Sequence, residues 1–120
     1  MKVKSIFKAT LLLSLIFAIQ SFTTNSGVEG IWAYEAPDAP YEYSKGDIII
    51  KKDKDRYKAT IKFQYDALDV KDVSVDKNVV VLGFFVEDTP VKVTLTIKGD
   101  KMTGISETPE GEISIIGKRK

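Results

Sequence analysis

Hydrophobic and polar residues alternate through most of the chain after residue 26. In the segment 56–65, polar residues alternate with five apolar ones: Tyr57, Ala59, Ile61, Phe63 and Tyr65. The segment 91–98 repeats this pattern. A period of two places one set of side chains on each face of a β-strand. The pattern predicts an all-β domain of about eight strands, with no helix beyond the N-terminal segment.

One segment departs from the regular alternation. Its apolar positions shift from Leu68 and Val70 to Val73 and Val75. A shift of one residue turns the side chains to the opposite face, unless the strand bulges or breaks. We therefore predict a bulge or a break near residues 71–72.

Short connections alternate along the chain with looser ones. The short connections are 53–55, 76–78 and 99–100, and the looser ones are 35–46, 64–69, 87–90 and 107–111. Alternate connections of an up-and-down meander lie at the same end, and a Greek key would need a long return connection that is absent. The sequence predicts an eight-stranded antiparallel up-and-down barrel. All 4 prolines fall in the looser connections, at one end of it.

The N-terminal segment has the order of a secretory signal. Lys2, Lys4 and Lys8 precede an apolar stretch over residues 9–19, and small polar residues follow it. This stretch is shorter than the roughly 20 residues that a membrane-spanning helix needs. We predict a cleavable signal helix over residues 1–24, with cleavage between 20 and 26, and one barrel domain over 27–120. The protein is then expected to be exported to the periplasm or the extracellular space, without stable membrane insertion after cleavage.

Composition excludes several classes of function. The residues after the signal hold 15 basic and 17 acidic side chains, a balance that disfavours a nucleic-acid-binding protein. The chain has no His and no Cys, so Ser-His and Cys-His nucleophiles and the usual zinc ligands are excluded. Lack of cysteine in an exported chain favours a bacterial source. We predict no cofactor, no metal site and no catalysis; a carboxylate pair is the one enzymatic alternative.

Both ends of the domain carry a motif. Gly30-Ile31-Trp32 opens the first strand and Arg119 lies near the end of the last one, where it is expected to cover the only Trp. This arrangement resembles the lipocalin-like (calycin) superfamily, whose first strand begins Gly-x-Trp and whose last strand sends a basic residue across that Trp. The segments 36–40 and 99–104 are similar to small exported lipocalin-like proteins of Bacteroidota-type bacteria, some of which sit beside hydrolase domains. The resemblance implies a lipocalin-like barrel with Gly30, Trp32 and Arg119 as a structural plug.

The Pro-bearing end is expected to be acidic and rich in tyrosine. The meander places many carboxylates at this end, and Lys45 is the cation that opposes them. The carboxylates are Glu35, Asp38, Glu42, Asp66, Asp69, Glu87, Asp88, Glu107 and Glu110. An acidic rim repels anions and attracts cations or neutral polyols. We predict that the ligand is bound at this mouth by Tyr34, Tyr41, Tyr43, Tyr65, Asp38 and Glu42. The cavity is predicted to be lined by Tyr57, Ile61, Phe63 and Phe85. Alternatively, Tyr41 and Tyr43 only pack across the barrel end.

Two functions from different classes fit this sequence. The first is an exported, non-catalytic barrel that binds a small neutral or cationic ligand, or a glycan, at its mouth. The second is an interaction module without a small-molecule ligand, in which the doubly apolar segment 79–86 and the loop 36–43 dock a protein such as a secreted hydrolase. A cavity of a few hundred Å³ opening toward Tyr41 and Tyr43 favours the first, and a filled barrel with an exposed apolar patch favours the second.

Overall fold

A computed structural model describes residues 27–120, so the predicted signal helix and its whole cleavage range lie outside the described residues. The elements are β1 (Gly30–Glu35), the 3-10 turn η2 (Tyr41–Tyr43), β2 (Lys45–Asp53), β3 (Arg56–Lys62), β4 (Ala67–Val70), β5 (Asp72–Asp76), β6 (Val79–Val86), β7 (Thr89–Lys98), β8 (Lys101–Thr108) and β9 (Gly111–Arg119). Within this range, no helix has the length and apolar character needed to cross a membrane.

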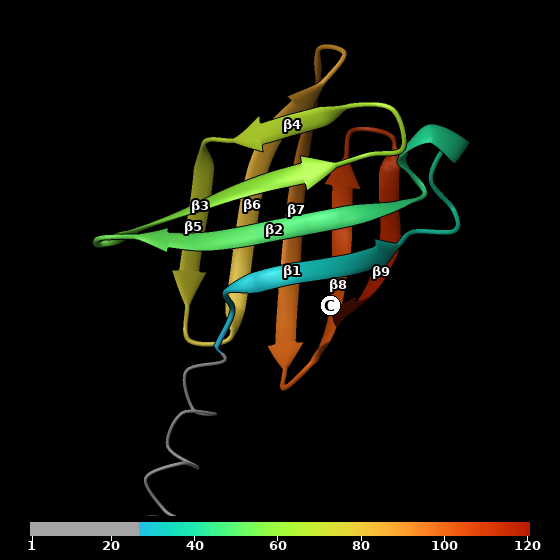
Figure 1. Ribbon diagram of the computed structural model, residues 1–120. Helices are drawn as coiled ribbons and strands as arrows, with labels where there is room; N and C mark the ends of the chain where they lie inside the picture. The colour runs from blue at the N-terminus through green and yellow to red at the C-terminus, as the bar shows by residue number, and fades with distance from the viewer. Residues whose placement is uncertain (1–26) are drawn as a thin grey trace, which may run out of the picture.

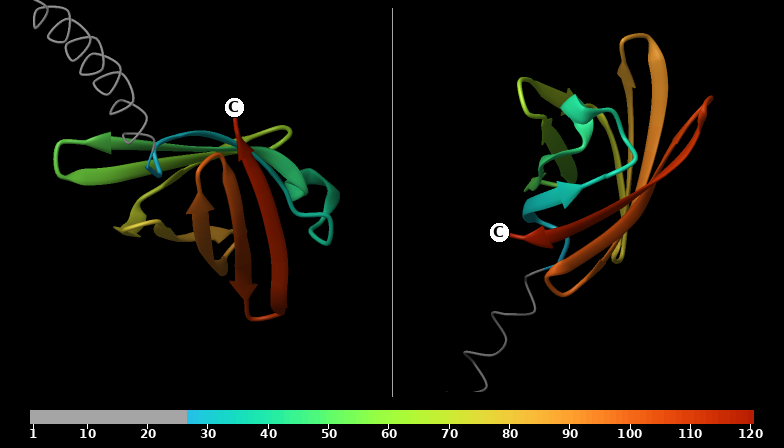
Figure 2. Two further views of the ribbon diagram at one scale, coloured as in Figure 1. Left: turned by 90° about the horizontal axis from the view of Figure 1, so that it is seen from below. Right: turned by 90° about the vertical axis from the view of Figure 1, so that its right-hand side faces the viewer.

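The strands form one antiparallel up-and-down sheet in the order β4-β3-β2-β1-β9-β8-β7-β6-β5. The first strand pairs with the last, so that the sheet curls into a nearly closed barrel. In Figure 1, β1 to β4 cross in front of β5 to β9, and Figure 2 shows the two halves of the sheet facing each other. Among the described strands, β4 and β5 are the sheet's two edges, and this seam keeps the barrel from closing fully.

The predicted break is present, and the predicted count of eight strands is wrong. Lys71 alone separates β4 from β5, and the two strands pair with different partners, β3 and β6. The shift in apolar phase explains the break, because it lets Val70 and Val73 both pack against the core, from different halves of the sheet. The barrel therefore has nine strands.

The interior follows the predicted alternation. Ala59 and Ile61 of β3 are buried, as are Val93, Leu95 and Ile97 of β7. The largest side chains of the core that are almost fully buried are Trp32, Ile50, Leu82, Leu95, Met102 and Val80. Most of this core lies toward the end of the barrel that carries the short turns.

Trp32 and Arg119 close that end of the barrel. They lie opposite each other in the β1–β9 register, and the Arg119 Cζ atom is 4.3 Å from the centroid of the Trp32 ring. Trp32 is fully buried and donates its indole N–H to the carbonyl of Val28 at 3.1 Å. The contact that the ends of the chain predict is thus present, and we call this region the closed end.

The Arg119 guanidinium also joins three segments of the chain. It donates to the carbonyls of Gly27 and Glu29 before β1, to that of Gly99 in the β7–β8 turn, and to the carboxylate of Asp100 at 3.0 Å. A Cβ on Gly30 would lie 2.7 Å from an Arg119 nitrogen, and Gly30 has a φ of 139°. The Gly-x-Trp motif therefore needs its glycine for the backbone conformation and for the space that the guanidinium occupies.

Arg119→Ala should lower the free energy of unfolding by about 2–3 kcal/mol, because it removes a cation–π contact and several charge-assisted hydrogen bonds. Arg119→Lys keeps the charge but loses the planar fork, so it should recover less than half of that loss. Guanidinium unfolding followed by the fluorescence of Trp32 measures both. Equal stability of the alanine variant and the wild type would contradict this role.

The short turns at the closed end share one backbone feature. In each two-residue loop the first central residue has a positive φ: 60° at Lys54, 59° at Lys77 and 60° at Gly99. A hairpin turn of this kind favours glycine at that position, because a Cβ is crowded there. The chain uses glycine in only one of the three.

Lys77→Gly should therefore raise the free energy of unfolding by roughly 0.5–1 kcal/mol, and Gly99→Ala should lower it by at least as much. Lys77→Gly removes the energetic cost of a Cβ at a positive φ, and Gly99→Ala introduces the same cost. Urea unfolding of both variants measures it, and a destabilised Lys77→Gly would refute the explanation.

Candidate functional site

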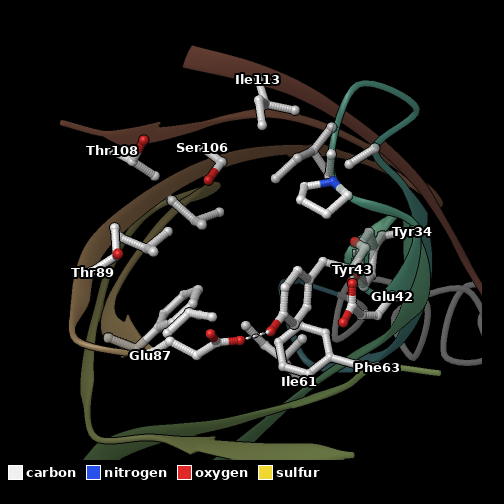
Figure 3. A pocket seen from close by; sticks show the side chains of 18 of the residues that line it. Tyr34, Glu42, Tyr43, Ile61, Phe63, Glu87, Thr89, Ser106, Thr108 and Ile113 are labelled. Atoms are coloured by element: carbon white, nitrogen blue, oxygen red, sulfur yellow. Dashed lines mark hydrogen bonds between the residues drawn. The ribbon is translucent and has the colours of Figure 1, made fainter. Parts of the chain in front are cut away.

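The Pro-bearing connections surround a cavity of about 570 Å³. It extends from core residues such as Ile48, Val93 and Ile115 to the connections that follow β1, β6 and β8. We call the end formed by these connections the mouth. Figure 3 shows the side chains arranged around an open centre. The lining residues with polar groups are Tyr34, Glu42, Tyr43, Glu87, Thr89, Ser106, Thr108 and Glu110.

The segment 36–44, which we call the mouth loop, is held by its own backbone. The Ala36 N–H donates to the carbonyl of Ser44 at 2.7 Å, so the loop closes on itself. Pro40 precedes η2 with a φ of −55°, which suits the start of a helical turn. The Tyr43 N–H donates to the Pro40 carbonyl at 2.8 Å. This short turn places Glu42 and Tyr43 at the cavity.

Tyr34 supports the mouth loop from below. Its ring is only 6% exposed, and its hydroxyl donates to the carbonyl of Tyr43 at 2.9 Å. Burial raises the pKa of Tyr34 to about 12, so the hydroxyl stays protonated and remains a donor at neutral pH. Gly46 of β2 is required mainly by the neighbouring strand, because a Cβ there would overlap the Lys62 carbonyl; it would also lie 3.2 Å from Tyr34 Cε2.

Tyr43 joins the mouth loop to the β6–β7 turn. Its hydroxyl donates to Oε2 of Glu87 at 2.9 Å, and its ring meets that of Phe63 edge-on at 4.9 Å between centroids. Figure 3 shows this hydrogen bond beside the cavity. The hydrogen bond to Glu87 is the main cause that raises the pKa of Tyr43, with smaller contributions from burial and from the charges of Glu87, Glu42 and Asp66.

The β6–β7 turn has an unfavourable backbone. Glu87 and Asp88 form its two central positions with φ of 49° and 71°. Turns with two positive φ values normally use Asn-Gly or Asp-Gly, because other side chains are crowded there. Strained residues of this kind are enriched at functional sites. Here the strain presents the Glu87 carboxylate to the cavity.

The opposite wall is built from β7, β8 and β9. It combines the hydroxyls of Thr89, Ser106 and Thr108 with aliphatic side chains such as Val91 and Ile113. Thr108 Oγ1 accepts a hydrogen bond from the N–H of Glu110 at 3.1 Å, which shapes the Pro109-containing turn. The cavity thus has one aromatic and acidic wall and one aliphatic wall with hydroxyl groups.

The structure brings together half of the residues that the sequence suggested for ligand binding and lining. Tyr34, Tyr43, Glu42, Ile61 and Phe63 line the cavity. The other five residues do not line it: Tyr41, Tyr65, Tyr57, Asp38 and Phe85.

Tyr41 is 68% exposed and lies in a separate groove, where its hydroxyl accepts a hydrogen bond from Gln64 at 3.2 Å. Tyr65 is 79% exposed beyond the end of β3. Tyr57 lies half-buried near the β2–β3 turn, with Lys52 Nζ 5.7 Å from its ring centroid. Asp38 and Phe85 do not line the cavity, and Phe84 takes the place suggested for Phe85.

Several lining residues were missing from the sequence-based site. Glu87 and Glu110 were counted only as part of the acidic rim, and Thr89, Ser106 and Thr108 were not considered. Alternation does not choose between Phe84 and Phe85, because the segment 79–86 is apolar on both faces. The hydroxyls of β8 do follow from alternation, since Ser106 and Thr108 follow Met102 at intervals of two.

Comparison with models of protein families, with curated proteins and with solved structures finds no match for this chain. The function must therefore be argued from the cavity itself. Among residues 27–120, no group of three acidic side chains is placed to hold a metal ion.

The raised pKa of Tyr34 predicts a loss of stability in alkali. The unfolded chain releases this proton near pH 10 and the folded chain near pH 12. The contribution of Tyr34 to stability is thus complete below pH 10 and falls as pH rises to about 12, by about 3 kcal/mol in total. Tyr34→Phe should make the free energy of unfolding fall less steeply over this range. Equal slopes for variant and wild type in denaturant titrations at several pH values would contradict the assignment.

Proposed function

We propose that this protein is a non-catalytic, lipocalin-like binding protein that holds one small ligand with an apolar body in the cavity at its mouth. The observation that carries the proposal is the cavity of about 570 Å³, which extends from the core to the connecting loops. Small-molecule sites span about 300–1,000 Å³ and combine apolar walls with a few polar groups that fix orientation. A barrel filled by its own side chains would have no such space.

The construction of the mouth also supports the proposal. The hydrogen bonds from Tyr34 to Tyr43 and from Tyr43 to Glu87 fix both sides of the entrance before any ligand arrives. A preformed site costs less conformational entropy on binding than one that must be ordered. The export that the N-terminal sequence predicts would place such a protein where it meets ligands outside the cytoplasm.

Docking of a protein partner is a second candidate, and one observation favours it. Phe85 is 66% exposed on the outer face of β6, which is the doubly apolar segment. Docking of a partner does not need the cavity. A variant that fills the cavity and leaves the outer face unchanged therefore distinguishes ligand binding from docking.

Ser106→Trp places a large side chain into the cavity. It should weaken the binding of the neutral fluorescent probe Nile red by about tenfold or more, because the apolar volume available to the probe falls. Titration of the probe at constant protein concentration measures this Kd.

Ser114→Trp is the matched control. Ser114 is exposed on the outer face of β9, so the same side chain enters no cavity and probe binding should equal that of the wild type. Thermal unfolding of both variants establishes that they are folded. Absence of probe binding to the wild type, or equal binding by both variants, would refute a ligand-binding cavity.

A further inference from the structure

The charge on the cavity wall is of one sign. Glu42, Glu87 and Glu110 line the cavity, and none of its lining residues is Lys or Arg. The ion pairs among the described residues lie elsewhere, at Lys58–Asp53, Arg119–Asp100 and Lys120–Asp47. The three carboxylates at the mouth therefore have no cationic side chain as an ion-pair partner within the part of the chain that the structure describes.

Aromatic rings line the same cavity as these carboxylates. Tyr34, Tyr43, Phe63 and Phe84 all line the same cavity, and Tyr43 and Phe63 are in edge-to-face contact. The faces of aromatic rings attract organic cations, most strongly where water is excluded. This observation is independent of the carboxylates and points to a ligand of the same charge.

We propose that the ligand is an organic cation with an apolar body, such as an alkylammonium compound, whose charged group lies among Glu42, Glu87 and Glu110 and whose body fills the apolar cavity. This inference rests on the proposed function and narrows it to one class of ligand. A neutral polyol or glycan fits less well, because the inner walls are mainly aliphatic and aromatic. An anionic amphiphile, such as a fatty acid, is repelled by all three carboxylates.

The three carboxylates come from three different connections. Glu42 belongs to the mouth loop, Glu87 to the β6–β7 turn and Glu110 to the β8–β9 turn. All three are exposed around the mouth, and they do not converge closely enough to hold a metal ion. Among the three, Glu87 has the hydrogen bond that holds its carboxylate in place: it accepts this bond from the hydroxyl of Tyr43. Its own backbone has a positive φ.

Three probes with one tail test the proposal: decyltrimethylammonium, decanol and decanoate. Displacement of Nile red from the full-length protein at pH 7.5 gives the affinity of each. We expect the ammonium compound to bind about tenfold more tightly than the alcohol and the carboxylate to bind most weakly. Added salt should weaken only the binding of the ammonium compound, because screening acts on the charge interaction.

The triple variant Glu42→Gln, Glu87→Gln, Glu110→Gln should lose most of the preference for the ammonium compound over the alcohol, and the aromatic rings account for what remains. The matched control is Glu35→Gln, Glu107→Gln, Glu112→Gln. It removes the same amount of charge near the same end, but from exposed residues that do not line the cavity. The control should keep the preference for the ammonium compound.

The outcomes separate the two proposals. If none of the probes binds, the proposed function itself fails. If the probes bind with equal affinities, the cavity binds ligands but the inference of a cation is wrong. If the control variant loses the preference as completely as the cavity variant, the preference comes from the general field of the acidic end, and the assigned site is wrong.

Discussion

The pairing of β1 with β9 is the constraint on which the rest of the structure depends. It joins the two ends of the domain, with Trp32 opposite Arg119 in the register. Without this pair, β1 and β9 would be two further sheet edges beside those of β4 and β5. Alternate connections share an end because each strand of a meander reverses direction, and closure brings these connections around one mouth. The contact at the closed end therefore helps to hold together the wall of the mouth at the opposite end.

The two ends of the barrel differ in how their polar groups are satisfied. At the closed end, the Arg119 guanidinium has carbonyl, carboxylate and aromatic partners. At the mouth, a turn with two positive φ values holds Glu87, and three carboxylates have no cationic neighbour on the cavity wall. Strain of this kind costs of order 1–3 kcal/mol per residue and persists only where the surrounding structure enforces it. The barrel provides that enforcement, since β6 and β7 pair along their full length.

Much of the fold could be predicted from the sequence, because strand alternation and turn residues are local signals. The Trp32–Arg119 contact, the break at Lys71 and the end at which each connection lies all follow from such signals. The expected looseness of the connections 87–90 and 107–111 is wrong, because both are two-residue turns and Pro90 lies within β7. The strand count was wrong because a local pattern does not tell whether a break leaves one bent strand or two strands with different partners.

The candidate site was only half predictable, for reasons that differ between residues. Tyr41 and Tyr43 are two residues apart in a polar loop, but the 3-10 turn directs them to different sides, since it has about three residues per turn. Phe84 and Phe85 lie in a segment that is apolar on both faces, where hydrophobicity alone cannot assign the inner one. Tyr65 continues the alternation of β3 in sequence, but the strand ends at Lys62, so its ring no longer faces the core.

The cavity itself is encoded by a change in side-chain size along the strands. The inward positions of β8 read Met102, Gly104, Ser106 and Thr108 from the closed end to the mouth, and those of β7 read Ile97, Leu95, Val93 and Val91. On these two strands, the larger apolar residues Met102, Ile97 and Leu95 lie toward the closed end, and smaller or hydroxylated ones line the cavity. Protein interiors are packed at high density, so a space of this size persists only where the surrounding side chains are too short to fill it. A barrel that needed only to be stable would gain from larger residues at these positions, so their small size supports the proposed ligand-binding function.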